Sequence, residues 1–338
     1  MRRRVWNSIV TMDAVSSFMV GLPSMTRTID YDCGEPWNIH DWELYEGMTE
    51  LPASRPPSEA TPVSYLLAKA RLLRPLGDVV DFISSPHRDS YDRALQIDEQ
   101  LSNAHLQMPS HLRLRDIEQT TTYSTAAINR MVQIEFLFHQ GVCVLHRRFL
   151  ARGRLDRRYA RSREQCIKSA MALLNHQRVL YEVSTKIGSL RDLYWFRMCF
   201  TSHAFILPAV ILCLDLRHSK KGFAECDQSY SWDGDTRDSA MLDAVKTAQT
   251  IWNEGQDMSP ETWKVHRVLS QLLESLDAGE KDGSLRSRNL EAALTMPEPI
   301  SLVQNGKLDL NQGIGTSVCD MDIDWVSLHI FREAIIHC

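Results

Sequence analysis

The sequence predicts an all-α protein, built as an irregular array of many helices. In several long stretches, apolar residues recur at the three- and four-residue spacing of amphipathic helices. No run of alternating apolar and polar residues marks a strand, and no repeat period is present. With 338 residues, 43% of them hydrophobic, the chain has enough apolar material to bury a sizeable core.

The first helix is expected over residues 5–20, and Gly21 and Pro23 end it. Residues 21–60 contain many prolines and glycines, so we expect irregular structure there. Two further helices are expected over residues 62–84, with a kink at Pro75, and over residues 89–106.

The longest helix is expected over residues 122–151, followed by helices over residues 158–184 and 190–216. The strongest apolar run, residues 204–214, lies in the last of these and stops at Asp215. Eleven residues are too few to cross a bilayer, so we interpret this run as a buried core helix and expect no membrane contact.

The rest of the chain alternates between polar and amphipathic stretches. A polar linker is expected over residues 218–237, and two shorter helices over residues 239–252 and 260–276. Trp325 to Ile336 has the pattern of a short amphipathic helix. We therefore divide the chain into a helical domain over residues 1–277, a flexible linker over residues 278–322, and a short C-terminal helix over residues 323–338.

Composition excludes several classes of function. The net charge of −5 at pH 7 gives the whole chain no nucleic-acid footprint. No two of the eight cysteines are closer than thirteen residues, so no zinc ribbon, zinc cluster or redox dithiol forms locally. We infer a reducing compartment. The cysteines are Cys33, Cys143, Cys166, Cys199, Cys213, Cys226, Cys319 and Cys338.

One helix face could present a metal-binding set. His139, Cys143 and His146 lie at positions i, i+4 and i+7, a spacing that suits zinc or copper. The surrounding helix is apolar and no fourth ligand lies near, so we interpret them as hydrogen-bonded or core side chains.

Local catalytic motifs do not occur. The chain has neither a G-x-S-x-G elbow nor a glycine-rich phosphate loop. The hypothesis of an enzyme, with a buried site near Trp195, Cys199 and His203, therefore rests on residue types alone. We predict a non-enzymatic protein.

Residues 147–163 form a basic run with a single acid, Asp156. A nuclear-import signal and a solvated helix end with its turn explain this run equally well, and direct contact with DNA is less favoured. The import candidates are Arg147, Arg148, Arg152, Arg154, Arg157, Arg158, Arg161 and Arg163.

Acidic and bulky apolar residues alternate near the C-terminus. This pattern is typical of an acidic activation segment that a coactivator groove binds. An ordinary helix start, with Asp324 as N-cap and two apolar residues packed inward, explains it slightly better. The candidate residues are Asp320, Asp322, Asp324, Trp325 and Leu328.

Two motifs resemble the regulatory, or middle homology, domain of fungal zinc-cluster transcription factors. The first begins with Arg2-Arg3-Arg4-Val5-Trp6, continues to Asp13, and ends in the turn Gly21-Leu22-Pro23. Asp30, Asp32, Pro36 and Asn38 then match the family's next stretch. The second motif is Phe138-His139 followed by Leu145-His146-Arg147-Arg148-Phe149-Leu150, in which Arg148 replaces the family's proline.

The resemblance covers about residues 1–270 and implies a nuclear, non-catalytic regulator of a metabolic or secondary-metabolite gene set. It implies protein partners, as a homo- or heterodimer or with a coactivator, and a small effector. DNA contact would be indirect and no cofactor is expected, because zinc would belong to a cluster that this chain lacks. A stand-alone or dominant-negative module that pairs with other zinc-cluster regulators is the alternative.

The family's domain normally begins before the first motif, so we expect the N-terminal helices of the array to be missing. Helices that would pack on a missing part expose apolar surface, which favours association. We therefore expect Val5, Trp6, Ile9 and Met12 to form an uncovered face.

Overall fold

A computed structural model describes residues 2–85, 90–114, 124–186, 205–222, 234–255 and 260–277. These residues form α-helices, short 3-10 helices and connecting loops, and none of them lies in a strand. The prediction of an all-α array is therefore confirmed. No helix among these residues is both long and apolar enough to cross a membrane.

The N-terminal part consists of three long helices and a long loop. Helix α1 covers Arg2–Val20, α2 covers Ser64–Ser84, and α3 covers Tyr91–Leu106. The intervening loop holds the 3-10 helices η1 (Thr26–Thr28) and η2 (Asp41–Glu43), and η3 (Ser110–Leu112) follows α3. Pro75, the expected site of a kink, lies inside helix α2.

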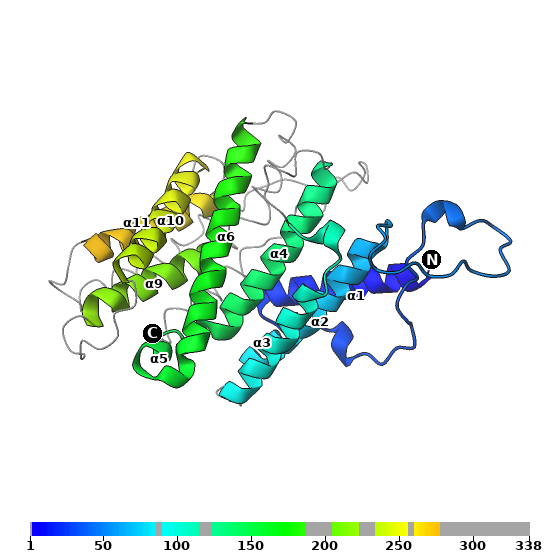
Figure 1. The fold of residues 1–338 in the computed structure, drawn as a ribbon, viewed down its shortest axis with the longest axis horizontal. Helices are drawn as coiled ribbons and strands as arrows, with labels where there is room; N and C mark the ends of the chain where they lie inside the picture. Colours follow the sequence, from blue (N-terminus) through cyan, green and yellow to red (C-terminus); the bar gives the residue numbers. More distant parts are fainter. Residues whose placement is uncertain are drawn as a thin grey trace, which may run out of the picture.

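The long helices α4 and α6 form the centre of the array. Helix α4 covers Thr125–His146, and the Ser124 side chain caps it by accepting from the Ala127 backbone N–H at 3.3 Å. A compact connection leads to α6, Ala160–Lys186, which returns alongside α4 (Figure 1). The connection contains η5 (Arg147–Phe149), α5 (Arg152–Leu155) and η6 (Arg157–Tyr159).

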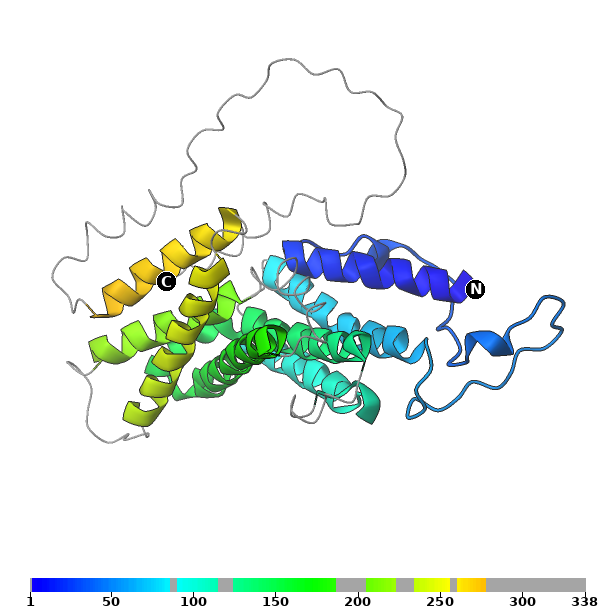
Figure 2. The same cartoon turned by 90° about the horizontal axis from the view of Figure 1, so that it is seen from above.

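Three further helices complete the described array. They are α9 (Ile206–Gly222), α10 (Gly234–Gly255) and α11 (Pro260–Asp277). These helices pack on one side of the α4–α6 pair, while α1, α2 and α3 lie on the other side (Figures 1 and 2). Helix α9 extends beyond the predicted end at residue 216, so the polar linker is shorter than the predicted 218–237.

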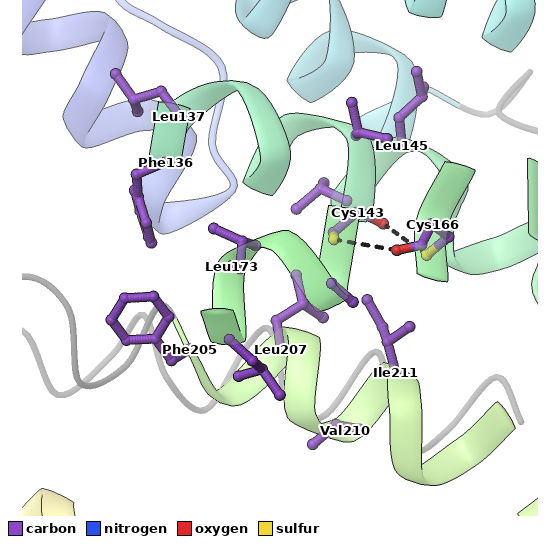
Figure 3. Close-up of a cluster of buried hydrophobic side chains, with 14 of the residues drawn as sticks. Phe136, Leu137, Cys143, Leu145, Cys166, Leu173, Phe205, Leu207, Val210 and Ile211 are labelled. Atoms are coloured by element: carbon purple, nitrogen blue, oxygen red, sulfur yellow. Dashed lines mark hydrogen bonds between the residues drawn. The ribbon is translucent and has the colours of Figure 1, made fainter. Parts of the chain in front are cut away.

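Apolar side chains from all the long helices meet in one core. In Figure 3, Phe136 of α4 faces Phe205, and the two rings contact each other edge to face with centroids 5.7 Å apart. The buried thiols of Cys143 and Cys166 each donate to the other residue's carbonyl oxygen, at 3.8 and 3.9 Å. These cysteines are free and burial raises the pKa of Cys143, as expected of inert structural thiols.

Gly141 allows α4 to approach α2 and α3 closely. A Cβ atom at this position would lie 2.3 Å from Leu76 Cδ2 and 3.1 Å from Leu101 Cδ2. Since both leucines are fully buried, neither side chain has free space into which it could move.

Candidate functional sites

The arginines of the first motif attach α1 to the loop that follows it. Arg4 forms an ion pair with Asp41 and also donates to the Ile39 carbonyl oxygen at 3.0 Å. Arg3 donates to the Glu35 carbonyl oxygen at 3.5 Å. The basic start of the chain therefore has a structural role in ordering residues 35–41.

Asp13 fixes the turn that ends α1. Gly21 has a positive φ of 71°, and the Leu22 N–H donates back to the Ser17 carbonyl, which is the geometry of a Schellman cap. The Asp13 carboxylate accepts from the Ser24 hydroxyl at 2.5 Å and from the Thr26 N–H at 2.9 Å. Burial would raise the pKa of Asp13, but these hydrogen bonds outweigh it and lower the pKa.

Asn38 is the centre of the loop between α1 and α2. Its side-chain N–H groups donate to the carbonyl oxygens of Pro56 and Glu59 at 3.1 and 3.3 Å, and its side-chain oxygen accepts from the Thr61 hydroxyl at 2.6 Å. The Asn38 backbone N–H donates to Ser54 Oγ at 3.0 Å. This buried amide therefore orders the segment around residues 54–61.

Exposed apolar side chains are concentrated at the N-terminal end. Thirteen large apolar side chains are exposed in the described part of the chain; two, Leu106 and Leu155, lie elsewhere, which leaves eleven in the first 51 residues. Val5, Ile9 and Met12 follow one face of α1 with exposed fractions of 57, 48 and 64%. We call these three residues the α1 stripe.

The expectation for Trp6 was wrong. Its side chain is half-buried and packs edge to face on Tyr31, with ring centroids 5.0 Å apart. The loop after α1 folds back over this side of the helix, so Trp6 anchors the loop, while the other three residues predicted for the uncovered face stay exposed.

Asp98, His146 and Ser162 form a buried cluster that combines the residue types of a catalytic triad. The His146 ring nitrogen Nδ1 lies 2.9 Å from Ser162 Oγ, which donates to the Tyr91 hydroxyl at 3.1 Å. His146 Nε2 lies 3.2 Å from Asp98 Oδ1, but out of line for a hydrogen bond. His146 and Ser162 are fully buried, which leaves no space for a substrate, so this cluster holds α3, α4 and α6 together.

Glu135 organises a second polar cluster between the same helices. Both of its carboxylate oxygens lie 3.0 Å from His105 Nε2, and Oε2 lies 3.7 Å from His139 Nε2. His139 Nδ1 also lies 3.2 Å from Ser169 Oγ. Burial lowers the pKa of His139 to about 4 and also lowers that of His176, so both rings are neutral at pH 7.

The set of His139, Cys143 and His146 separates into three environments. His139 belongs to the Glu135 cluster, Cys143 contacts Cys166 in the core, and His146 belongs to the Asp98 cluster. Among the residues that the structure describes, no group of three or more His, Cys, Asp or Glu side chains has the arrangement of a metal site.

The basic run divides into arginines with different roles. Arg154 and Arg163 bind the carboxylate of Asp215, which is 1% exposed, through hydrogen bonds of 2.8 to 3.1 Å. Hydrogen bonds from Arg163 and Arg154 outweigh the effect of burial and lower the pKa of Asp215. Arg152, Arg157, Arg158 and Arg161 are exposed, and Arg147 and Arg148 are half-buried.

Other candidates lie outside the described residues. These are the activation-segment residues Asp320, Asp322, Asp324, Trp325 and Leu328, the helix predicted over residues 323–338, and the enzyme candidates Trp195, Cys199 and His203.

The described residues form an all-helical domain in which clusters of polar side chains join neighbouring helices. No known protein-family profile matches the chain, and no solved structure matches it. Several curated proteins, however, are similar to the chain in sequence. The chain is 35% identical over 274 residues, 81% of its length, to the Zn(2)-C6 fungal-type transcription factor pigI of Monascus ruber. It is 29% identical over 331 residues, 94% of its length, to the transcription factor mpsB of Macrophomina phaseolina, and 29% identical over 284 residues, 84% of its length, to the equisetin cluster transcription factor eqxF of Fusarium heterosporum.

The chain belongs to the family of fungal Zn(2)-C6 transcription factors. It spans 34% of pigI, 45% of mpsB and 40% of eqxF, and so corresponds to less than half of each relative. The resemblance seen in the sequence motifs is confirmed. Their residues Arg3, Arg4, Asp13 and Asn38 maintain the fold of the N-terminal part.

Proposed function

We propose that this chain is the regulatory part of a fungal transcription regulator, acts in the nucleus through protein contacts, and catalyses no reaction. The homology over four fifths or more of the chain is the observation that carries the proposal. Two polar clusters support it, because hydrogen bonds within the protein occupy side chains that an enzyme would use on substrate. Contact with DNA is indirect in this proposal, and the chain binds no cofactor of its own.

The regulated genes are a secondary-metabolite set. Relatives carry the names of the equisetin and pyrrolocin cluster transcription factors, and the latter is 36% identical over 217 residues. These names describe the relatives, and we extend the class of gene set to this chain as part of the proposal.

The α1 stripe contacts a second helical domain of the same type. A stripe at positions i, i+4 and i+7 is the pattern with which one helix packs on another, and its side chains are 48 to 64% exposed. A homodimer, or a heterodimer with another zinc-cluster regulator, would bury it. A stand-alone module that pairs with such regulators is the alternative function, and it would use the same stripe.

The test places the chain on a reporter promoter through a heterologous DNA-binding domain in a filamentous fungus. We expect reporter output to change, and the double substitution Ile9→Glu/Met12→Glu to reverse that change and shift the purified chain from dimer to monomer in light scattering. Leu155→Glu, at a side chain that is 92% exposed but isolated, is the matched control and should alter neither result.

A nuclear, folded fusion that leaves the reporter unchanged would contradict the proposal. The stand-alone module would then be favoured if the free chain lowers the output of a co-expressed zinc-cluster regulator and Ile9→Glu/Met12→Glu relieves that inhibition.

A further inference from the structure

A cavity of about 830 Å³ lies between the long N-terminal loop and helices α2 and α3. Its walls come from the loop segments 35–38 and 54–57, from residues 64–78 of α2, and from residues 100–109, which comprise the end of α3 and the residues just after it. Pockets that enclose small organic molecules have volumes of about 300 to 1,000 Å³. The cavity is therefore large enough for a molecule of some tens of non-hydrogen atoms.

The wall combines an apolar floor with amide groups. Apolar surface comes from α2 (Leu67, Ala68 and Pro75), from α3 (Ala104) and from Met108, which follows α3. The amides that face the same cavity are those of Asn38, Gln100, Asn103 and Gln107. This combination suits a mainly apolar molecule that carries a few hydrogen-bonding groups.

At one point of the rim, two arginines face a single carboxylate. Arg71 and Arg74 share one carboxylate, Glu35, at 3.4 and 2.8 Å. Each of the other charged side chains of the wall is already paired with an oppositely charged residue. Asp78 pairs with Arg27 at 2.5 Å, and Arg55 pairs with two glutamates. Within the described part of the chain, no second carboxylate pairs with Arg71 or Arg74, so an additional anion would balance the charge there.

The loop side of the cavity is held in place from outside it. Asn38 orders the segment from Ser54 to Thr61, and Arg3 and Arg4 bind the backbone of Glu35 and Ile39. A wall that is already ordered loses little conformational entropy when a ligand binds. The motif residues that mark the family thus also shape this cavity.

We propose that this cavity binds an apolar organic acid, whose carboxylate is held by Arg71 and Arg74 in competition with Glu35 and whose body lies on the α2–α3 floor. The inference rests on the proposed function, and such an acid would be the small effector that the family resemblance implies. The inference therefore gives that effector a site and a chemical class.

The test measures binding of 11-(dansylamino)undecanoic acid, a fluorescent fatty acid, to the purified full chain, and uses its methyl ester as the uncharged control. We expect the acid to bind about tenfold more tightly than the ester, and Arg71→Gln/Arg74→Gln to remove that difference. Glu35→Gln should tighten acid binding several-fold, because the competing carboxylate is gone. Ala104→Trp, which fills the cavity from the α3 side, should weaken both probes.

Two control variants separate this site from other surfaces. Arg178→Gln removes an arginine of similar exposure from an ion pair on α6, and Met12→Glu disrupts the α1 stripe; neither should change the affinity. Equal binding of acid and ester, or unchanged affinity in Arg71→Gln/Arg74→Gln with a native melting curve, would overturn the inference. Unchanged affinity in a folded Ala104→Trp variant would do the same. This assay needs no promoter, so its result is independent of the reporter test. If the acid binds but the reporter stays unchanged, only the proposed function is refuted. If the reporter responds but the acid does not bind, only the effector site is refuted.

Discussion

Arg163 and Asp215, 52 positions apart in the sequence, form a bidentate ion pair in which the guanidinium donates two hydrogen bonds of 2.8 Å to a buried carboxylate. Arg154 adds a second guanidinium to the same carboxylate. The pair joins α6 to α9 and ties α5 to both, so it connects the central helices to the α9–α11 side of the array.

Asp215→Ala should destabilise the protein strongly. Removing the carboxylate leaves two guanidinium groups, on side chains that are 19 and 23% exposed, without their partner. Breaking a fully buried pair typically costs about 3–5 kcal/mol, and we expect a loss at the lower end of this range because water reaches the two arginines. Urea unfolding at pH 7 measures the loss. Arg178→Ala, which breaks the exposed pair with Glu182, is the control and should lose less than about 1 kcal/mol. A similar small loss in both variants would show that the Asp215 pair contributes little.

The same pair predicts weakening in acid. Because the pKa of folded Asp215 is lowered, the stabilisation is fully present above the pKa of the unfolded chain and is lost as the pH falls through the folded pKa. Asp215→Ala should therefore lose less stability than the parent between pH 5 and pH 2.5, measured as the change in urea midpoint.

The import hypothesis is best tested on arginines that do not hold Asp215. Substitution of Arg157 and Arg158 by Gln should lower the nuclear fraction of a tandem fluorescent-protein fusion, with little change in melting temperature, because these side chains are exposed. Arg161 is kept in this variant, because it pairs with the buried Asp98 at 3.5 Å. The matching Arg→Lys variant keeps the charge and should stay nuclear. An unchanged nuclear fraction in the Gln variant would favour the solvated helix end.

Most of the long helices were predictable because they carry an apolar stripe, as α3 does with Ala94, Ile97 and Leu101. Helix α5 was not predicted, since the four residues Arg152–Leu155 are too few to show a period. The predicted end of the helix at residue 216 was wrong because Asp215 looked like a polar stop. Its charge is neutralised by Arg154 and Arg163, so the helix continues past it.

Family motifs identified Asp13 and Asn38 but could not give their roles. Asp13 binds Ser24 and Thr26 across a turn, and Asn38 binds residues as far ahead as Thr61. Hydrogen bonds between such distant positions leave no regular spacing in the sequence. For the same reason the cavity, which combines three separate segments, has no signature in the sequence.

His139→Gln should reduce the loss of stability that accompanies mild acidification. Since burial lowers the pKa of His139 from 6.5 to about 4, the unfolded chain binds more protons between these values and stability falls with pH in that window. At pH 5 the difference from pH 7 amounts to about 2 kcal/mol from this residue. Glu135, His105, His176 and Lys168 surround the ring and remain in both proteins. Equal losses in parent and variant between pH 7 and pH 5, measured by urea unfolding, would contradict the assignment.

Gly141→Ala should destabilise the protein although alanine is the better helix former. The gain in helix propensity is at most about 1 kcal/mol, whereas extra atoms in a packed core typically cost about 1–3 kcal/mol. The new methyl group would overlap Leu76, which has no space to move, so the overlap should outweigh the gain and α4 should shift from α2.

The control for this substitution is Gly34→Ala, whose methyl group would meet only the Arg3 side chain, at the ordinary contact distance of 3.7 Å. It should unfold at a urea concentration close to that of the parent. Shortening the obstructing side chain in the double variant Gly141→Ala/Leu76→Val should recover part of the stability, because the two changes occupy the same space. If instead the double variant loses the sum of the two single losses, the close approach of α4 to α2 is not what requires glycine at position 141.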